Sequence, residues 1–236
     1  MPNPILNNGL TSAAAAMQLL ERRQQILANN LANANTRGFK AETPFSKMIG
    51  DAIAATDTAI DLTQGTLTET HNPLDLSVEG DGFFVTQSPN GREHLVRGGA
   101  FELNRERQLT DLSGNFVLGE DGPITLPLGK EISVSPDGQI RVDSKVVASL
   151  RLERVDPKAR LMHESGTQFV ADPSRQPIPL AERKIHQGSV EESNVNTMSA
   201  MTQMIEVMQR YSSAQKSLAT IDSIRGIAVN DLAKVS

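Results

Sequence analysis

Residues 9–40, GLTSAAAAMQLLERRQQILANNLANANTRGFK, contain no proline and no glycine between Gly9 and Gly38, and they predict one long helix from about Gly9 to Thr36. Apolar or small side chains recur in this stretch at alternating intervals of three and four, which is the spacing of one helix face. The positions on that face are Leu10, Ala13, Met17, Leu20, Gln24, Leu27, Leu31 and Ala34, of which Gln24 is the one polar member. Gly38 then suits a left-handed residue after the helix end. At 1.5 Å per residue, such a helix is about 40 Å long.

A second helical stretch is predicted at the other end of the chain. Asn196 is a favourable N-cap, no glycine lies between Gly188 and Gly226, and the last proline is Pro179. The apolar positions of this stretch follow the same spacing or its multiple: Met201, Met204, Met208, Tyr211, Leu218 and Ile221.

The middle of the chain has the pattern of a β domain. Ten of the 17 glycines lie from Gly80 to Gly138, as expected for short strands joined by tight turns. The candidate strands are 74–78, 83–87, 94–97, 116–118, 132–135, 139–142 and 146–155. Five of the seven phenylalanines also lie in the middle, so the compact core is expected there. This pattern predicts a small antiparallel barrel or sandwich.

The predicted fold class is α+β, with long N- and C-terminal helices packed in a coiled-coil-like inner layer and a central all-β, barrel- or sandwich-like domain. Residues 1–39 and 189–236 are predicted to form a helical assembly domain. Residues 40–73 are predicted to be an intermediate linker with a short helix near 45–55, and residues 74–188 a β-rich outer domain.

An ordinary intramolecular core is the simpler explanation of the two apolar stripes. Two features favour packing between copies instead. Asparagines, which are poor helix formers, crowd the end of the first helix, so that helix needs external packing. Two helices that pair only with each other also have little interior to bury, and identical copies supply more.

Composition excludes several classes of protein. A net charge of −5 argues against a nucleic-acid binder, which normally shows a basic stripe. The absence of cysteine excludes disulfides and thiolate chemistry. The first 25 residues lack a basic region followed by a continuous apolar run, so we expect no cleaved signal peptide. No apolar stretch approaches 18 residues, and we therefore expect no membrane insertion.

No catalytic, cofactor-binding or metal-ligating residue is predicted. The four histidines are at least 23 residues apart, which gives no metal-ligand spacing. Residues 79–82, EGDG, are predicted to be a tight turn, because their acidic side chains would repel phosphate. A pair of carboxylates placed for glycoside hydrolysis stays open, since sequence alone selects no such pair.

Several strings resemble, in order, the signatures of the bacterial flagellar rod and hook protein family. ANNLANANTRGFK at 28–40 resembles the N-terminal signature of that family. The second signature is matched by QGTLTET at 64–70, NPLDL at 72–76 and GDGFF at 80–84, and RGGAF at 97–101 continues it. QGSVEESNVN at 187–196 resembles the C-terminal signature. Because the matches cover both ends and the middle, the resemblance is highly specific.

This resemblance implies an axial component of the flagellum that the flagellar type III export apparatus secretes. The implied function is that of a structural subunit of the periplasmic rod, which polymerises helically with copies of itself and other rod proteins and transmits torque. No cofactor is implied. The predicted assembly residues are Leu10, Met17, Leu20, Leu27, Asn30, Leu31, Asn33, Asn194, Val195, Asn196, Met201, Met204, Met208, Tyr211, Leu218 and Ile221.

Within the family, the short chain is most similar to proximal rod members that carry a β domain. Distal rod members are the alternative, although they have a longer segment than residues 40–63 before the second signature. Outside the family, the alternatives are a peptidoglycan hydrolase and a coiled-coil adaptor that stops at a dimer.

Overall fold

The computed structural model describes residues 4–49, 52–129, 131–156, 161–171 and 175–235. The described chain divides into two compact units. The first, here called the helical unit, holds α1, β1, most of β2, and α2. The second, the β unit, holds residues 33–41 and 59–195.

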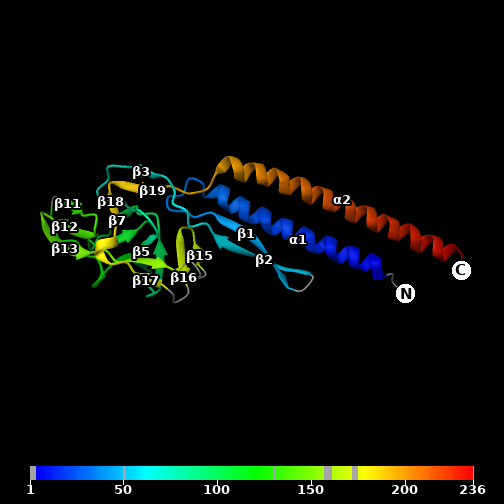
Figure 1. The fold of residues 1–236 in the computed structure, drawn as a ribbon, viewed down its shortest axis with the longest axis horizontal. Coiled ribbons are helices and arrows are strands. Elements are labelled where there is room, and N and C mark those ends of the chain that lie inside the picture. The colour runs from blue at the N-terminus through cyan, green and yellow to red at the C-terminus, as the bar shows by residue number, and fades with distance from the viewer. Residues whose placement is uncertain (1–3, 50–51, 130, 157–160, 172–174, 236) are drawn as a thin grey trace. The chain divides into compact units, whose positions relative to one another are not determined.

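The helical unit contains both α-helices, α1 (Pro4–Ala32) and α2 (Thr197–Val235), and the hairpin of β1 (Glu42–Ile49) and β2 (Ala52–Ile60). The helices pack side by side and antiparallel, as Figure 1 shows, and β1 packs against α1. Asn196 caps α2, because its Oδ1 accepts a hydrogen bond from Ser199 N at 2.9 Å.

One asparagine of the crowded end of α1 explains how the hairpin is held. Asn30 is buried, and its side-chain Nδ2 donates to Glu42 O at 2.8 Å. Its Oδ1 accepts from Glu42 N at 2.9 Å, so one amide side chain satisfies both backbone groups of the first residue of β1. Asparagine lowers the helix propensity at position 30, but its two hydrogen bonds to Glu42 offset that loss, and an aliphatic residue could not form them.

The β unit is built from short strands that pair antiparallel in every register that is described. Its strands are β3 (Leu67–Glu69), β4 (Leu76–Val78), β5 (Gly82–Gln87), β6 (Glu93–Val96), β7 (Phe101–Leu103), β8 (Leu109–Asp111), β9 (Phe116–Gly119), β10 (Gly122–Pro123), β11 (Ile132–Val134), β12 (Gln139–Val142), β13 (Lys145–Ser149), β14 (Leu152–Val155), β15 (Leu161–Ser165), β16 (Gln168–Ala171), β17 (Arg175–Pro177), β18 (Ile185–Gln187) and β19 (Ser189–Glu191). A 3₁₀ turn, η1 (Leu180–Glu182), precedes β18.

The main sheet of the described strands runs in the order β15-β16-β6-β5-β9-β8-β7, with β10, β14 and β17 attached to it. Its central strand β5 alternates between two apolar clusters, because successive side chains of a strand point to opposite faces. Phe84 packs in the larger cluster, where its ring meets Phe101 edge-on at 5.2 Å. Phe83 packs in the smaller cluster, with Phe169 at 5.9 Å.

The predicted fold class is wrong in its helical part. The described residues form two α-helices, one at each end of the chain, and are otherwise mostly strands, so no coiled-coil-like inner layer of long helices is present. Where a short helix was predicted near 45–55, residues 42–49 and 52–60 instead form β1 and β2. The physical reason is that packing against α1 and pairing within the hairpin outweigh the helix propensity of the alanines in this stretch.

Candidate functional site

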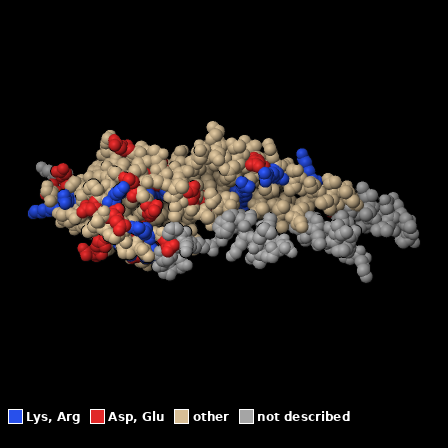
Figure 2. All heavy atoms as spheres, in the orientation of Figure 1, with Lys and Arg blue, Asp and Glu red and all other residues tan. Residues whose placement is uncertain are grey.

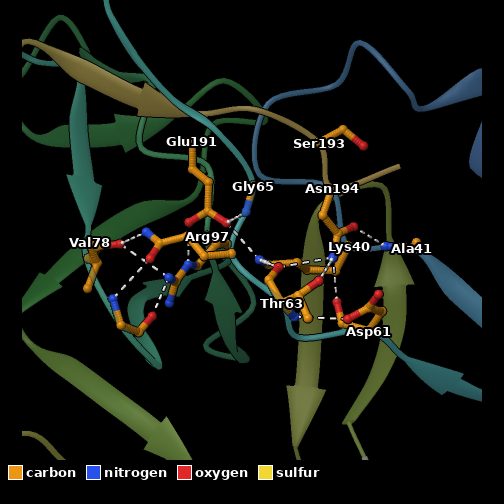
Figure 3. A network of polar contacts seen from close by, with 12 residues as sticks. Lys40, Ala41, Asp61, Thr63, Gly65, Val78, Arg97, Glu191, Ser193 and Asn194 are labelled. Carbon is orange, nitrogen blue, oxygen red and sulfur yellow. Dashed lines mark hydrogen bonds and ion pairs between the residues drawn. The ribbon is translucent and has the colours of Figure 1, made fainter. Parts of the chain in front are cut away.

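A buried polar cluster in the β unit brings together segments that are far apart in the sequence. We call Lys40, Arg97, Glu191 and Asn194 the junction (Figure 3). Glu191, at the end of β19, is fully buried. Its Oε1 accepts from Lys40 Nζ at 2.6 Å and from Gly65 N at 2.9 Å, and its Oε2 accepts from Arg97 Nε at 2.5 Å. One carboxylate thus balances two buried cations.

Arg97 explains the turn of residues 79–82. Its guanidinium is buried and donates to the carbonyl oxygens of Gly80 and Gly82, and also to Val78 O at 3.2 Å. It lies over the Phe83 ring, with Cζ 5.6 Å from the ring centroid. The backbone carbonyls of Gly80 and Gly82 therefore point toward the guanidinium of Arg97, which agrees with the predicted tight turn. They do not form a phosphate-binding loop.

Lys40 is held by two acceptors inside the protein. Its Nζ donates to Thr63 O at 2.6 Å as well as to Glu191. Burial lowers the pKa of Lys40, and the hydrogen bond and ion pair with Glu191 oppose that shift. Removing one partner of a buried ion pair leaves an uncompensated charge and costs about 3–5 kcal/mol.

Asn194 ties the polypeptide on either side of the junction. Its Oδ1 accepts from Ala41 N at 2.7 Å. Its Nδ2 donates to Asp61 O at 2.8 Å and to Thr63 O at 3.0 Å. A side-chain amide has both donors and acceptors, so Asn194 bridges two backbone segments where a carboxylate would repel the carbonyls.

Two glycines allow the backbones of the junction to approach each other. Gly38 has φ +70°, and a Cβ built on it would lie 1.9 Å from Gly98 N. A Cβ on Gly65 would lie 2.0 Å from Glu192 O. Both distances are far below any real contact, so no other residue fits at either position without moving the chain.

Strand pairing places the C-terminal segment against residues 67–78. β18 pairs with β4 and β19 pairs with β3, so that Glu191 lies opposite Leu67. Between the two pairs, Gly188 N donates to Asp75 O at 2.8 Å. Strings of the second and the C-terminal signatures therefore lie side by side in the β unit.

A pH-dependent stability is expected from Glu79, which joins the end of β4 to β18. Its carboxylate accepts from His186 Nε2 at 3.0 Å and from Lys184 Nζ at 3.2 Å, and these contacts, His186 first, lower the pKa of Glu79. An acid with a lowered folded pKa contributes stability above its unfolded pKa of about 4.3, and this contribution is lost as the pH falls through the folded value. Glu79→Gln should therefore flatten the acid-side fall of the unfolding free energy, measured by urea titration from about pH 5 to pH 3. The exposed Glu106, changed to Gln, is the control, and equal flattening in both variants would contradict the prediction.

The predicted assembly residues of α1 lie mainly on its covered face. Leu27 and Asn30 are buried, and Met17, Leu20 and Leu31 are half-buried. Leu10 belongs to α1, but its side chain lies outside the described residues. The remaining predicted residues before α2 lie in the β unit or cap the helix: Asn33, Asn194 and Val195 are half-buried, and Asn196 is the exposed N-cap of α2.

The predicted residues of α2 fall on two different faces. Met204, Tyr211, Leu218 and Ile221 are half-buried. They share their side of the helix with Ala200 and Val207, which are buried in the helical unit. Met201 and Met208 are exposed instead, and Met198 and Ile205 are exposed with them. The sequence prediction merged these two faces into one stripe.

Three charged residues of the junction were not among the predicted site residues. Lys40 and Glu191 lie 151 positions apart, and Arg97 lies 94 positions before Glu191. No local spacing signals such a cluster. The signal that was present is indirect, because each residue stands inside a string that resembles a family signature.

Comparison with protein families matches three separate stretches of the chain. Residues 10–40 match the family described as flagella basal body rod protein. Residues 77–142 match the flagellar hook protein FlgE/F/G D1 domain, and residues 186–231 match the flagellar basal body rod FlgEFG protein C-terminal family.

Curated relatives extend this match over nearly the whole chain. The flagellar basal-body rod protein FlgF of Mesorhizobium japonicum is 33% identical over 219 residues, which cover 87% of this chain and 90% of the relative. FlgF of Caulobacter vibrioides is 31% identical over 246 residues, with 98% and 100% covered. The chain belongs to the flagellar basal-body rod protein family. It is a structural subunit of the rod, of the proximal type, and not an enzyme.

The junction links the three matched stretches of this rod protein. Lys40 is the last residue of the first stretch, Arg97 lies in the second and Glu191 in the third. Each matched stretch thus contributes one charged side chain to the same buried cluster. No group of three or more potential metal-ligating side chains occurs among the described residues of the rod subunit, and none of its described helices is long and apolar enough to cross a membrane.

Proposed function

We propose that copies of this chain join one another and other rod proteins through the exposed apolar stripe on α2. The stripe consists of Met198, Met201, Ile205 and Met208, whose exposed fractions are 73%, 49%, 57% and 55%. Intervals of three, four and three place these side chains on one face of the helix. This is the observation that carries the proposal, since a contiguous apolar face left open to water marks a surface that another protein covers.

The stripe is distinct from the face that α2 uses within its own chain. Val207 and Ala200 are buried while their neighbours Met208 and Met201 are exposed, so α2 has one satisfied apolar face and one open one. Charged residues gather over the β-rich unit in Figure 2. The stripe itself consists of four uncharged apolar side chains. A face with few charges forms contacts without desolvating ions.

The choice of proximal over distal rod rests on the relatives. Curated FlgF proteins are 31–33% identical to this chain, and FlgG proteins of Buchnera aphidicola are 26–27% identical. We further propose that the subunit polymerises helically, transmits torque across the periplasm, is delivered by the flagellar type III export apparatus without cleavage of a signal peptide, and binds no nucleic acid.

Complementation tests the proposed function. In a strain that lacks its own FlgF-type gene, this chain should restore swimming and be recovered in purified basal bodies with an uncleaved N-terminus. Restored swimming without the protein in basal bodies would contradict a structural role. A zymogram of the purified chain addresses the peptidoglycan hydrolase alternative, because cleared peptidoglycan would show an activity that a purely structural subunit lacks.

A further inference from the structure

The short connector that follows α1, residues 38–41, is held by the C-terminal segment of the β unit. Gly38 N donates to Glu191 O at 2.7 Å, and Asn194 N donates to Phe39 O at 3.3 Å. Ala41 N donates to Asn194 Oδ1 at 2.7 Å. The backbones of three of the four connector residues, and the side chain of Lys40, therefore form hydrogen bonds with residues 191–194, which lie about 150 positions later in the chain.

Other parts of the β unit contribute less to the connector. Asp61 N donates to Ala41 O at 2.8 Å. The His163 ring stacks on Phe39 at 5.2 Å between centroids, and one ring nitrogen lies 3.1 Å from Lys40 O. These contacts place the connector beside β15 but leave the amides of Gly38 and Ala41 dependent on the C-terminal segment.

The buried charges make the position of the connector depend still more strongly on the segment that carries Glu191. Lys40 and Arg97 are both buried, and the carboxylate of Glu191 contacts both. Before Glu191 arrives, burying the Lys40 side chain beside Arg97 brings together two like charges without the anion between them. The connector cannot take its observed place at low cost until the segment that carries Glu191 has docked.

The core of the β unit depends little on this segment. The buried residues of the smaller cluster end at Phe169, and the larger cluster takes one residue, Ile185, from the stretch after Ile178. Val190 of the segment is also buried but belongs to neither cluster. Sheet formation and connector docking are therefore separable events, because the apolar burial that drives the first is supplied almost entirely by residues 76–178.

We propose that residues 189–194 act as a latch, which fixes the connector on the β unit only when the C-terminal segment is in place. The connector therefore docks only in a chain that includes this segment. A chain that ends before Glu191 has a folded sheet and an undocked connector. This inference concerns the single subunit and goes beyond the proposed function. Its consequence for the rod subunit is that incomplete chains lack a docked connector.

Amide hydrogen exchange on the full-length chain tests the latch, because it reports the connector and the β5–β6 pair separately. Asn194→Ala removes the acceptor for Ala41 N, and Glu191→Gln removes the carboxylate that pairs the two cations. A latch acts as one cooperative element, so each variant should speed exchange at both Gly38 and Ala41 at least tenfold. The β5–β6 amides, such as those of Val85 and Leu95, should keep their parent rates.

Glu192→Gln is the matched control, because it makes the same change one residue away, outside the junction, and should leave all four rates unchanged. Two results would overturn the proposal. In the first, Asn194→Ala speeds exchange at Ala41 alone, which shows separate local bonds in place of a cooperative latch. In the second, the β5–β6 amides accelerate as much as the connector, which shows that the segment is part of the core. Asn194→Ala leaves the buried ions intact, so this test stands even where Glu191→Gln fails to fold.

Discussion

Met208→Glu is expected to abolish swimming and incorporation into basal bodies while leaving the isolated subunit as stable as the parent chain. Met208 is exposed in the single subunit, where a glutamate meets water and disturbs no packing. In an assembly that covers the stripe, the same glutamate is buried without a partner at a cost of several kcal/mol per ion, repeated in every copy. The measurements are swimming, the amount of subunit in purified basal bodies, and the urea midpoint of the isolated chain.

Ser213→Glu is the control for Met208→Glu, because it adds the same charge five residues away at an exposed position on the side of α2 that carries Arg210, off the stripe. It should swim normally. Wild-type swimming of the Met208 variant would show that this face stays in water, and equal loss in both variants would show that any added charge on α2 is harmful.

Gly38→Ala is expected to have the largest effect on the stability of the subunit among substitutions of turn glycines. Both Gly38 and Gly91 have positive φ, +70° and +86°, and alanine costs about 1–2 kcal/mol in that region at either position. The Cβ at Gly91 meets nothing within 4 Å, whereas at Gly38 it overlaps the backbone of Gly98. Gly38→Ala should therefore lower the free energy of unfolding in urea by about 2 kcal/mol or more beyond the loss in Gly91→Ala, because the overlap must push two backbones apart.

Comparing these two alanine variants separates packing from backbone strain, because the strain is common to both. Equal destabilisation would mean that the connector moves away from Gly98 without cost, and the junction would then not be a rigid contact.

Local sequence signals identified the elements whose stability is itself local. The strands near the glycine turns were predicted because a tight turn imposes its residue types directly on the sequence, as the EGDG string at residues 79–82 does. The N-cap of α2 at Asn196 was predicted for the same reason, and the observed hydrogen bond to Ser199 N confirms it. The N-cap contact lies within four residues, whereas the carbonyls of Gly80 and Gly82 are also held by the distant Arg97.

The β1–β2 hairpin shows where local signals fail. Residues 42–60 carry no strong strand alternation, and the hairpin gains its stability from pairing and from packing on α1, with Asn30 satisfying both backbone groups of Glu42. These contacts come from a different part of the chain. Propensity alone therefore favoured a short helix there and missed the strands.

The two faces of α2 were merged because heptad spacing identifies apolar positions without saying what covers each one. Met204 and Met208 are both methionine and lie one turn apart, yet the first is half-buried and the second is exposed. The junction was missed for the opposite reason, since its partners lie 94 and 151 residues apart and isolated Lys, Arg and Glu residues look like surface charges in sequence.

Thiol labelling of the α2 stripe is the most direct test of whether it joins neighbouring rod subunits. The chain has no cysteine, so Met201→Cys introduces a single thiol at an exposed position of the stripe. A maleimide should label this thiol rapidly in the isolated subunit, but should label it in purified basal bodies only after denaturation. Equal labelling in the subunit and in intact basal bodies would contradict the stripe as the contact between subunits.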